Sequence, residues 1–199
     1  MNNYQHIIFD LGGVLIELGK MPIPESYFGN GNWVTLKEWF SSPIAHEFEQ
    51  GKVSAEFLAS KFIDQFELNI SIDVFIELFS LWPQRVNPGA KELLIELAKK
   101  YQLSVLSNCN VIHWPLMDNK FHILRYFHNK FSSHLIGLTK PDISIYEHVL
   151  EKLNTSPSSV LFFDDNQKNI GAANSIGIKS VLVNGTQEIK KYLYNNNLM

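Results

Sequence analysis

Five short apolar runs, each bounded by polar residues or glycine, constrain the fold of this chain most strongly. They are separated by wide intervals and are typical of buried strands, at 6–9, 103–106, 135–138, 160–163 and 180–183. Stretches with helical periodicity lie between them, notably over 89–101 and 143–153. Because strand and helix alternate from residue 88 onward, the sequence predicts an α/β fold with a doubly wound parallel sheet covered on both faces.

The interval between the first two predicted strands is too long for one crossover helix, since about 90 residues separate them. Apolar periodicity predicts helices in this interval at 33–40, 43–49, 54–66 and 71–81. In the third helix, Phe57, Leu58, Phe62 and Phe66 form an apolar stripe that is typical of a bundle core. We therefore predict a helical insert over 16–86 and a core formed by 1–15 and 87–199.

The charge and cysteine content exclude several classes of protein. The 199 residues contain 17 Lys or Arg and 20 Asp or Glu, for a net charge of −3, and no basic run. This composition argues against a nucleic acid or an anionic membrane as partner. The single Cys109 excludes an internal disulfide, and the N-terminus lacks the pattern of a signal peptide. We therefore expect a soluble, cytoplasmic protein.

Polar side chains follow the predicted strands at four places. They are Asp10, the pair Ser107 and Asn108, Lys140, and the pair Asp164 and Asp165. Each of them alone is explained equally well as a helix cap or a turn. Because the carboxyl ends of parallel strands meet at one edge of a sheet, the four places together predict a single ligand site.

Three carboxylates at one edge repel each other unless a cation neutralises them. Oxygen ligands without a Cys or His cluster favour Mg²⁺, which commonly binds one or two carboxylates together with a substrate phosphate. Lys140 and the hydroxyl of Ser107 are suitable donors to phosphate oxygens. The sequence thus predicts a magnesium site beside a phosphate site.

The chain resembles the haloacid dehalogenase superfamily of phosphohydrolases over essentially the whole core. The resemblance is carried, in order, by 9–15 (FDLGGVL), 106–108 (LSN), 140–142 (KPD), and 163–166 (FDDN) with Asn169. The insert is similar to the C1 cap that closes over the active site in these enzymes. Within the superfamily, 160–177 and the pair Gly12 and Gly13 are most similar to bacterial sugar phosphatases, including glucose-1-phosphate phosphatases.

This resemblance implies a role for each matching residue. Asp10 is expected to be the nucleophile that forms an aspartyl-phosphate. The carboxylate of Asp10, the backbone carbonyl of Gly12 and the side chain of Asp165 are expected to bind Mg²⁺, with Asp164 binding it directly or through water.

The resemblance also implies the residues that bind the substrate. Ser107 is expected to donate to the phosphoryl oxygens, and Lys140 to bind phosphate and keep Asp10 ionised. Asn108 is a further candidate for orienting the phosphate or the nucleophile.

One position departs from the family pattern. Many of these phosphatases carry a second Asp two residues after the nucleophile as general acid and base, whereas this chain has Gly12. Such assistance is typically worth about 10² to 10⁴ in rate. Either another residue takes the role, or the leaving group needs little help, as in a sugar 1-phosphate. His46, Glu47 and Glu49 of the insert are candidate substitutes, and exposed helix surface is the alternative explanation for each.

These observations predict a Mg²⁺-dependent phosphatase that acts on a small phosphorylated metabolite, with a sugar phosphate as the expected substrate. One alternative is a non-catalytic protein that binds a phosphometabolite or a protein partner. The other is a metal-independent 2-haloacid dehalogenase, against which the acidic pair Asp164 and Asp165 argues, since that chemistry needs no cation.

Overall fold

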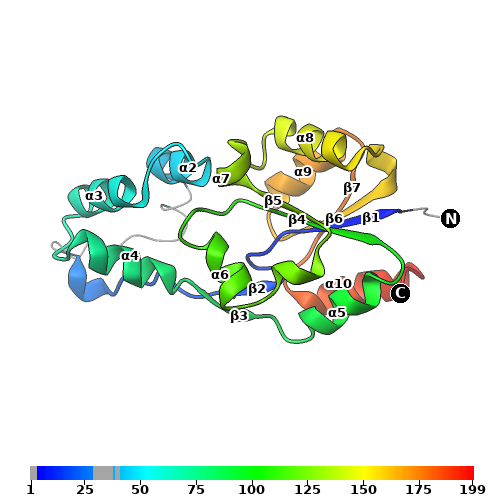
Figure 1. Cartoon of the computed structure of the whole chain (residues 1–199), viewed down its shortest axis with the longest axis horizontal. Helices are drawn as coiled ribbons and strands as arrows, with labels where there is room; N and C mark the ends of the chain where they lie inside the picture. Colours follow the sequence, from blue (N-terminus) through cyan, green and yellow to red (C-terminus); the bar gives the residue numbers. More distant parts are fainter. Residues whose placement is uncertain (1–3, 29–37, 39–40) are drawn as a thin grey trace.

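A five-stranded parallel sheet forms the centre of the molecule (Figure 1). The computed structural model describes residues 4–28, 38 and 41–199. The strands lie in the order β5-β4-β1-β6-β7, and their bounds are β1 His6–Phe9, β4 Gln102–Ser107, β5 Asn129–Ser132, β6 Val160–Asp164 and β7 Lys179–Leu182. Because β1 lies between β4 and β6, in register with both, its carboxyl end is at the middle of the sheet edge.

Helices cover both faces of this sheet, as the sequence predicts. Helices α5 (Ala90–Leu97), α6 (Trp114–Asn119) and α10 (Thr186–Asn195) lie on one face, and α8 (Ile143–Leu153) and α9 (Gln167–Ser175) on the other (Figure 1). Side chains alternate accordingly, since Ile7 and Phe9 pack into the cluster with α5 and α10, whereas Ile8 packs into the cluster with α8 and α9. The short elements η2 (Leu124–Tyr126), α7 (Ser133–Ile136) and η3 (Pro157–Ser159) connect these layers.

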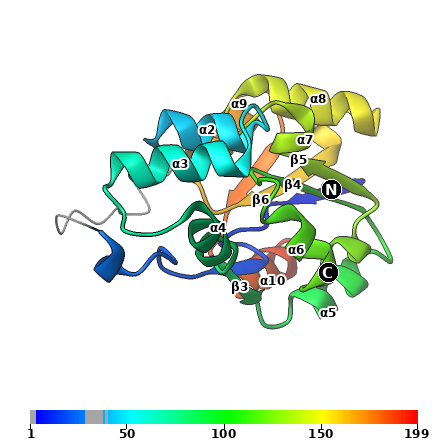
Figure 2. The ribbon, with the colours of Figure 1, turned by 60° about the vertical axis from the view of Figure 1, so that its left-hand side comes forward.

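The insert has a hydrophobic cluster of its own. It contains η1 (Glu25–Tyr27), α2 (Pro43–Glu49), α3 (Ala55–Gln65) and α4 (Ile72–Ser80), which lie beyond the sheet edge (Figure 2). The hydroxyls of Ser54 and Ser71 accept hydrogen bonds from backbone N–H groups in the first turns of α3 and α4. Phe62 is buried in the cluster, but Phe57 is 47% exposed. Phe57 therefore does not belong to the buried face of α3, contrary to the predicted apolar stripe.

The insert predicted over 16–86 is not entirely helical, because it has a short strand at each end. Strand β2 (Ile16–Leu18) pairs antiparallel with β3 (Pro83–Val86), and this two-stranded ribbon connects the insert to the sheet region. The strands are three and four residues long, too short to produce a period-2 pattern in the sequence. Pairing across the insert, including an ion pair of 2.7 Å between Arg85 and Glu17, determines their conformation instead.

The predicted strand at 135–138 is also wrong. The strand that pairs with β4 is β5, at Asn129–Ser132, and Leu135 lies in α7 with 66% of its surface exposed. Strand β5 begins with the polar residues Asn129 and Lys130, so it has no apolar run that would predict a buried strand. Helix α5 ends at Leu97, four residues earlier than predicted, and the predicted helix at 33–40 lies outside the described residues except for residue 38. Over the described part of the chain, every helix is too short or too polar to cross a bilayer.

Candidate functional site

The four predicted polar clusters meet at the carboxyl edge of the sheet. Asp10 directly follows β1, Ser107 ends β4, and Asp164 ends β6. Carboxylate oxygens of Asp10, Asp164 and Asp165 lie within 4.8 Å of one another. The Lys140 ammonium lies 3.0 Å from Asp10 Oδ1 and 2.6 Å from Asp164 Oδ2, although β5 ends eight residues before Lys140. The sheet and the loop after α7 therefore bring the predicted residues together.

Lys140 carries a buried positive charge, with 4% of its surface exposed. Its ammonium also donates to the carbonyl of Leu106 at 3.1 Å. Burial by itself lowers the pKa of a lysine, but the carboxylates of Asp10 and Asp164 outweigh that effect and raise the pKa of Lys140 above its ordinary value. Lys140 therefore remains an ammonium at physiological pH, beside the carboxylate of Asp10.

Asn108 fixes the backbone of Lys140 through two hydrogen bonds. Its Nδ2 donates to the carbonyl of Lys140, and its Oδ1 accepts from the backbone N–H of Lys140, each at 2.9 Å. Both ends of the amide are thus engaged. This geometry favours a positioning role for Asn108 over the direct contact with phosphate that the sequence suggests.

Asp164 is fully buried and has polar partners for both oxygens. Its Oδ1 accepts from the backbone N–H of Asn166, and Asn169 Nδ2 donates to Oδ1 at 2.9 Å and to Oδ2 at 3.1 Å. Tyr146 in turn donates its hydroxyl to the carbonyl of Asn169. Asp164 is therefore the fixed anchor that holds the Lys140 ammonium.

Asp165 is the most exposed of the three carboxylates and faces the backbone of Gly13. A Cβ atom on Gly13 would lie 2.1 Å from Asp165 Oδ2, and Gly13 has a φ of +69°, so only glycine fits at this position. Partial burial and the charges of Asp10 and Asp164 raise the pKa of Asp165 to about 7. The Asp165 carboxylate therefore lies in an environment with an excess of negative charge.

The donor set of this edge suits a hard divalent cation. Three carboxylates share one ammonium, and Asp10 Oδ1 is buried without a hydrogen bond, since Lys140 approaches it as an ion pair only. Burial also raises the pKa of Asp10 above its ordinary value. Oxygen ligands with excess negative charge match the preferences of Mg²⁺.

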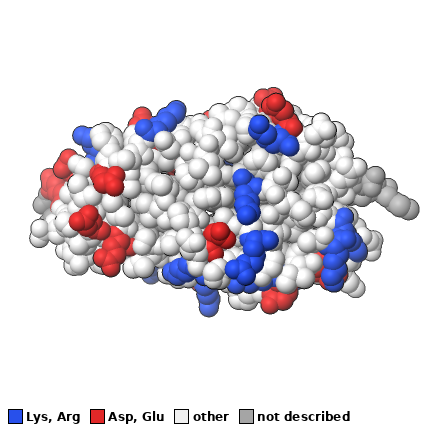
Figure 3. All heavy atoms as spheres, in the orientation of Figure 1, with Lys and Arg blue, Asp and Glu red and all other residues white. Residues whose placement is uncertain are grey.

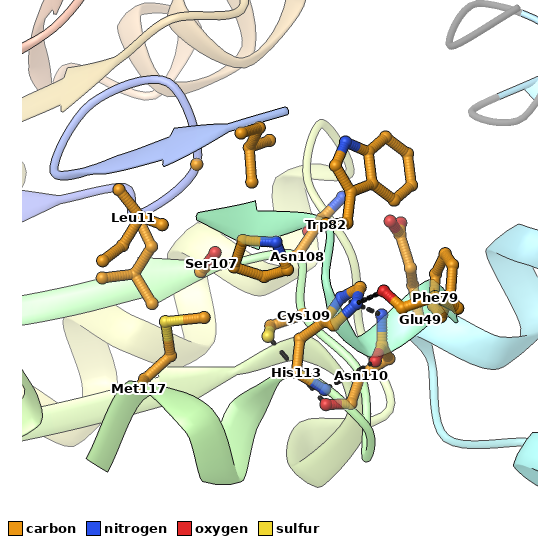
Figure 4. Close-up of a pocket in the computed structure, with 14 residues that line it drawn as sticks. Leu11, Glu49, Phe79, Trp82, Ser107, Asn108, Cys109, Asn110, His113 and Met117 are labelled. Atoms are coloured by element: carbon orange, nitrogen blue, oxygen red, sulfur yellow. Dashed lines mark hydrogen bonds between the residues drawn. The ribbon is translucent and has the colours of Figure 1, made fainter. Parts of the chain in front are cut away.

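A pocket lies between the sheet edge and the insert, next to the loop that follows Asp10. Gly12, Ser107 and Asn108 line it on the sheet side, and the hydroxyl of Ser107 makes no hydrogen bond to any residue that the structure describes. In Figure 4, Leu11, Ser107 and Met117 lie on one side of the pocket and Glu49, Phe79 and Trp82 on the other. Much of the lining is apolar, including Leu11, Ile16, Leu18, Phe79, Trp82 and Met117.

Two further polar residues of the pocket bind each other and the backbone. His113 Nε2 lies 2.8 Å from the carbonyl of Phe79, and His113 Nδ1 lies 3.2 Å from Asn110 Nδ2 (Figure 4). Asn110 Oδ1 accepts from two backbone N–H groups. Burial lowers the pKa of His113 to about 4, so the ring is neutral and donates from Nε2. Neither side chain is free to bind a ligand.

The three candidate acid-base residues of the insert have different surroundings. His46 and Glu47 are exposed, and His46 contacts Gln50, which caps the C-terminal end of the same helix. Glu49 instead lines the pocket, where burial raises its pKa to about 7. The thiol of Cys109 is buried, and burial raises its pKa to about 12.

Sequence analysis misses several residues that shape the site. The contact between Gly13 and Asp165 has a signal in the sequence, the pair of glycines after the nucleophile, but its meaning depends on a contact across the sheet edge. Phe79, Trp82 and Leu18 also line the pocket, and no sequence signal links them to it, because the pairing of β2 with β3 has no counterpart in the sequence.

Comparisons with known proteins find relatives along most of the chain. The model of the family of haloacid dehalogenase-like hydrolases matches residues 4–177. A D-ribitol-5-phosphate phosphatase from Bacteroides thetaiotaomicron is 24% identical over 185 residues, covering 88% of this chain and 90% of that protein. The sesquiterpene phosphatase AstK from Aspergillus oryzae is 30% identical over 187 residues, covering 88% and 87%.

A solved structure shares the fold along nearly the whole chain. It is a haloacid dehalogenase family enzyme from Bacteroides thetaiotaomicron in complex with magnesium and inorganic phosphate, with a TM-score of 0.77 and 24% identity, covering 90% of this chain and 93% of that one. Since the family model covers most of the chain and a relative at 30% identity spans it, this chain belongs to the haloacid dehalogenase-like hydrolases and is a hydrolase.

Proposed function

We propose that this hydrolase is a Mg²⁺-dependent phosphatase of small phosphorylated metabolites that works through an aspartyl-phosphate on Asp10. One observation carries the proposal. The carboxylate of Asp10 lies 3.0 Å from the Lys140 ammonium and within 4.8 Å of the oxygens of Asp164 and Asp165, and the next two residues, Leu11 and Gly12, line a pocket together with Ser107.

In this proposal Asp10, the carbonyl of Gly12 and Asp165 hold Mg²⁺, and Asp164 contributes through water or directly. The hydrogen bonds of Asp164 to Asn166 and Asn169 favour the indirect role, because its oxygens already have protein partners. When bound, Mg²⁺ supplies charge stabilisation for the phosphoryl oxygens. The magnesium in the similar Bacteroides enzyme supports this assignment.

The residues of the chain then divide the chemistry between them. A carboxylate oxygen of Asp10 attacks phosphorus, the bond from phosphorus to the ester oxygen breaks, and water later hydrolyses the aspartyl-phosphate. Ser107 donates to a phosphoryl oxygen, and the Lys140 ammonium favours the ionised form of Asp10 while it binds a second phosphoryl oxygen. Asn108 holds Lys140 in place through its backbone.

Two substrate classes are supported by different observations. A sugar phosphate, such as a sugar 1-phosphate, is supported by the sequence resemblance and by the ribitol-5-phosphate phosphatase among the relatives. A phosphate ester of an apolar alcohol is supported by the lining of the pocket, where Asn110 and His113 offer no free hydrogen bond to a sugar hydroxyl, and by the sesquiterpene phosphatase.

We also propose that 16–86 act as the cap over a core formed by 1–15 and 87–199, and that the protein is cytoplasmic. The separate hydrophobic cluster of the insert supports the division, and the β2–β3 ribbon is its connector. The buried free thiol of Cys109 is compatible with a reducing compartment.

The direct test is phosphate release from a panel that pairs sugar phosphates with phosphate esters of aliphatic and aromatic alcohols. We expect activity in Mg²⁺, loss of activity in EDTA, and loss in Asp10→Asn, which keeps the shape of the side chain without a nucleophilic carboxylate. Full activity of Asp10→Asn, or full activity in EDTA, would contradict the proposal. The preferred member of the panel decides between the two substrate classes.

A further inference from the structure

Breaking a phosphate ester places negative charge on the departing oxygen, and a proton must reach it when the alcohol is weakly acidic. Gly12 has no side chain to supply this proton. A Cβ atom at position 12 would lie 2.9 Å from Leu18 Cδ1, so Leu18 of the β2–β3 ribbon already occupies the space next to Gly12. The proton donor must therefore come from another wall of the pocket.

Glu49 is the carboxyl group that the insert contributes to this pocket. It lines the same cavity as Gly12, Ser107 and Asn108, and Figure 4 shows it on the side opposite Leu11 and Ser107. Its side chain makes no hydrogen bond or ion pair with the residues that the structure describes. A substrate whose phosphate lies near Ser107 therefore extends into the pocket that Glu49 lines.

Three contacts hold the end of α2 in place, all to the segment that leads to Lys140. Ser133 Oγ lies 2.6 Å from the carbonyl of Glu49, and Gln50 Nε2 donates to Thr139 Oγ1 at 3.3 Å. Gly51 packs so closely on the backbone of His134 that a Cβ atom would lie 2.3 Å from its carbonyl oxygen. Glu49 is therefore positioned by the same loop that positions Lys140.

The other polar groups of the pocket are less suited to this role. Asn108, Asn110 and His113 are engaged with protein partners, and the thiol of Cys109 is buried. Ser107 lies next to the phosphate site rather than across from it. Among the described residues that line the pocket, Glu49 is the one carboxyl group.

We propose that Glu49 is the general acid and base of this enzyme, an assignment that rests on the phosphatase function proposed above. As the bond from phosphorus to the ester oxygen breaks, the protonated Glu49 carboxyl gives its proton to that oxygen and the neutral alcohol leaves. The Glu49 carboxylate then takes a proton from the water that attacks the aspartyl-phosphate, which releases inorganic phosphate and restores the protonated carboxyl.

A pair of substrates with different leaving groups tests this assignment. p-Nitrophenolate is a stable anion that leaves without being protonated. The butoxide of n-butyl phosphate is strongly basic and must receive a proton as it leaves. We expect Glu49→Gln to lower kcat/KM for n-butyl phosphate by about 10²- to 10⁴-fold and to change kcat/KM for p-nitrophenyl phosphate by less than about threefold. Hydrolysis of the aspartyl-phosphate also loses its general base in Glu49→Gln and becomes slow. This variant should therefore release p-nitrophenol in a burst followed by slow turnover.

Matched variants separate the outcomes. Glu47→Gln lies on the same helix, is exposed, and should leave both kcat/KM values unchanged. The role of Glu49 would be overturned if Glu49→Gln lowered kcat/KM equally for both substrates and showed no burst. The proposed phosphatase function would still hold in that case if the wild-type activity depended on Asp10. If the wild type releases phosphate from no member of the substrate panel, or Asp10→Asn matches the wild type, the proposed function fails and this assignment with it.

Discussion

Gly13 shows at the scale of one residue how the backbone makes room for the chemistry. Its φ of +69° and the closeness of Asp165 Oδ2 both exclude a side chain. The absence of a Cβ atom allows Asp165 to approach the loop after β1, where Asp10 lies. The glycine is thus part of the carboxylate cluster although it contributes no polar side chain.

We expect Gly13→Ala to abolish Mg²⁺ binding and phosphatase activity, because the new Cβ atom displaces the Asp165 carboxylate. The backbone strain alone costs about 1 kcal/mol of stability. Gly177→Ala is the matched control, since Gly177 also has a positive φ, of +89°, but a Cβ atom there meets only Pro157 Cβ at 3.4 Å. Activity and the Mg²⁺-induced rise in Tm measure the difference. Equal behaviour of the two variants would contradict the steric argument.

Lys140 shows how one residue balances the buried charges of the site. Lys140→Met leaves the carboxylates of Asp10 and Asp164 without their ammonium, and removal of one partner of a buried ion pair typically costs about 3–5 kcal/mol. We expect urea unfolding in EDTA to show a loss of this size. The double variant Lys140→Met with Asp164→Asn should recover part of it, because one buried negative charge is also removed. A double variant less stable than Lys140→Met would argue against charge imbalance as the cause.

At the scale of elements, the sequence predicts the helices that have a clear periodic pattern. It does not predict the short strands whose conformation depends on a distant partner. Helices α2 and α8 begin and end where predicted, and α3 has Ser54 as its N-cap. Strands β2, β3 and β5 are missed, since each is short and its conformation depends on pairing across many residues. The same kind of distant contact fixes the end of α2 on α7 and places Glu49 in the pocket.

Gly51→Ala tests the docking of α2 on the segment around α7. A Cβ atom would lie 2.3 Å from the backbone oxygen of His134, which cannot rotate away, so the end of α2 must move. A displacement of about 1 Å at a catalytic group can cost about 10²-fold in rate, and we expect a loss of this order in kcat/KM for n-butyl phosphate. Gly137→Ala, at the end of α7, introduces similar strain at a φ of +80° with nothing within 4 Å, and should retain activity. Comparable losses in both variants would refute the docking argument.

At the scale of the whole molecule, charge is divided between the two regions. In the view of Figure 3, acidic side chains gather over the far end of the insert, and most Lys and Arg lie over the sheet region. Residues 16–86 contain ten Asp or Glu against five Lys or Arg. The proposed phosphate site therefore lies on the less acidic region, although its own edge has an excess of carboxylates when no cation is bound.

This excess predicts how the metal-free protein responds to pH. The pKa of Asp165 rises from an ordinary 3.8 to about 7 on folding, so between these pH values the native state binds more protons than the unfolded chain. The stability that Asp165 contributes is thus greatest at low pH and is lost as pH rises toward 7. In EDTA, we expect the free energy of unfolding of the wild type, minus that of Asp165→Asn, to fall between pH 4 and 7 and then to level off.

Chemical denaturation at a series of pH values measures this difference, in which titrating groups distant from Asp165 cancel because both proteins carry them. Saturating Mg²⁺ should remove the fall, since a bound cation favours the ionised carboxylate. Asp118→Asn, on α6 and exposed, is the control for removal of one negative charge. A difference that stays constant from pH 4 to 7 in EDTA would contradict the proposed crowding of carboxylates.

The sequence by itself determined the α/β class and the helical insert, because buried strands and amphipathic helices have local periodic patterns. It also determined the residues that meet at the sheet edge, because the carboxyl ends of parallel strands share that edge. The tertiary structure alone decided which polar groups remain free. The side chains of Asn108, Asn110 and His113 have protein partners, whereas the Glu49 side chain has none among the residues that the structure describes. The physical reason is that hydrogen-bond satisfaction and steric closeness, as between Gly13 and Asp165, depend on contacts between segments that are distant in the chain.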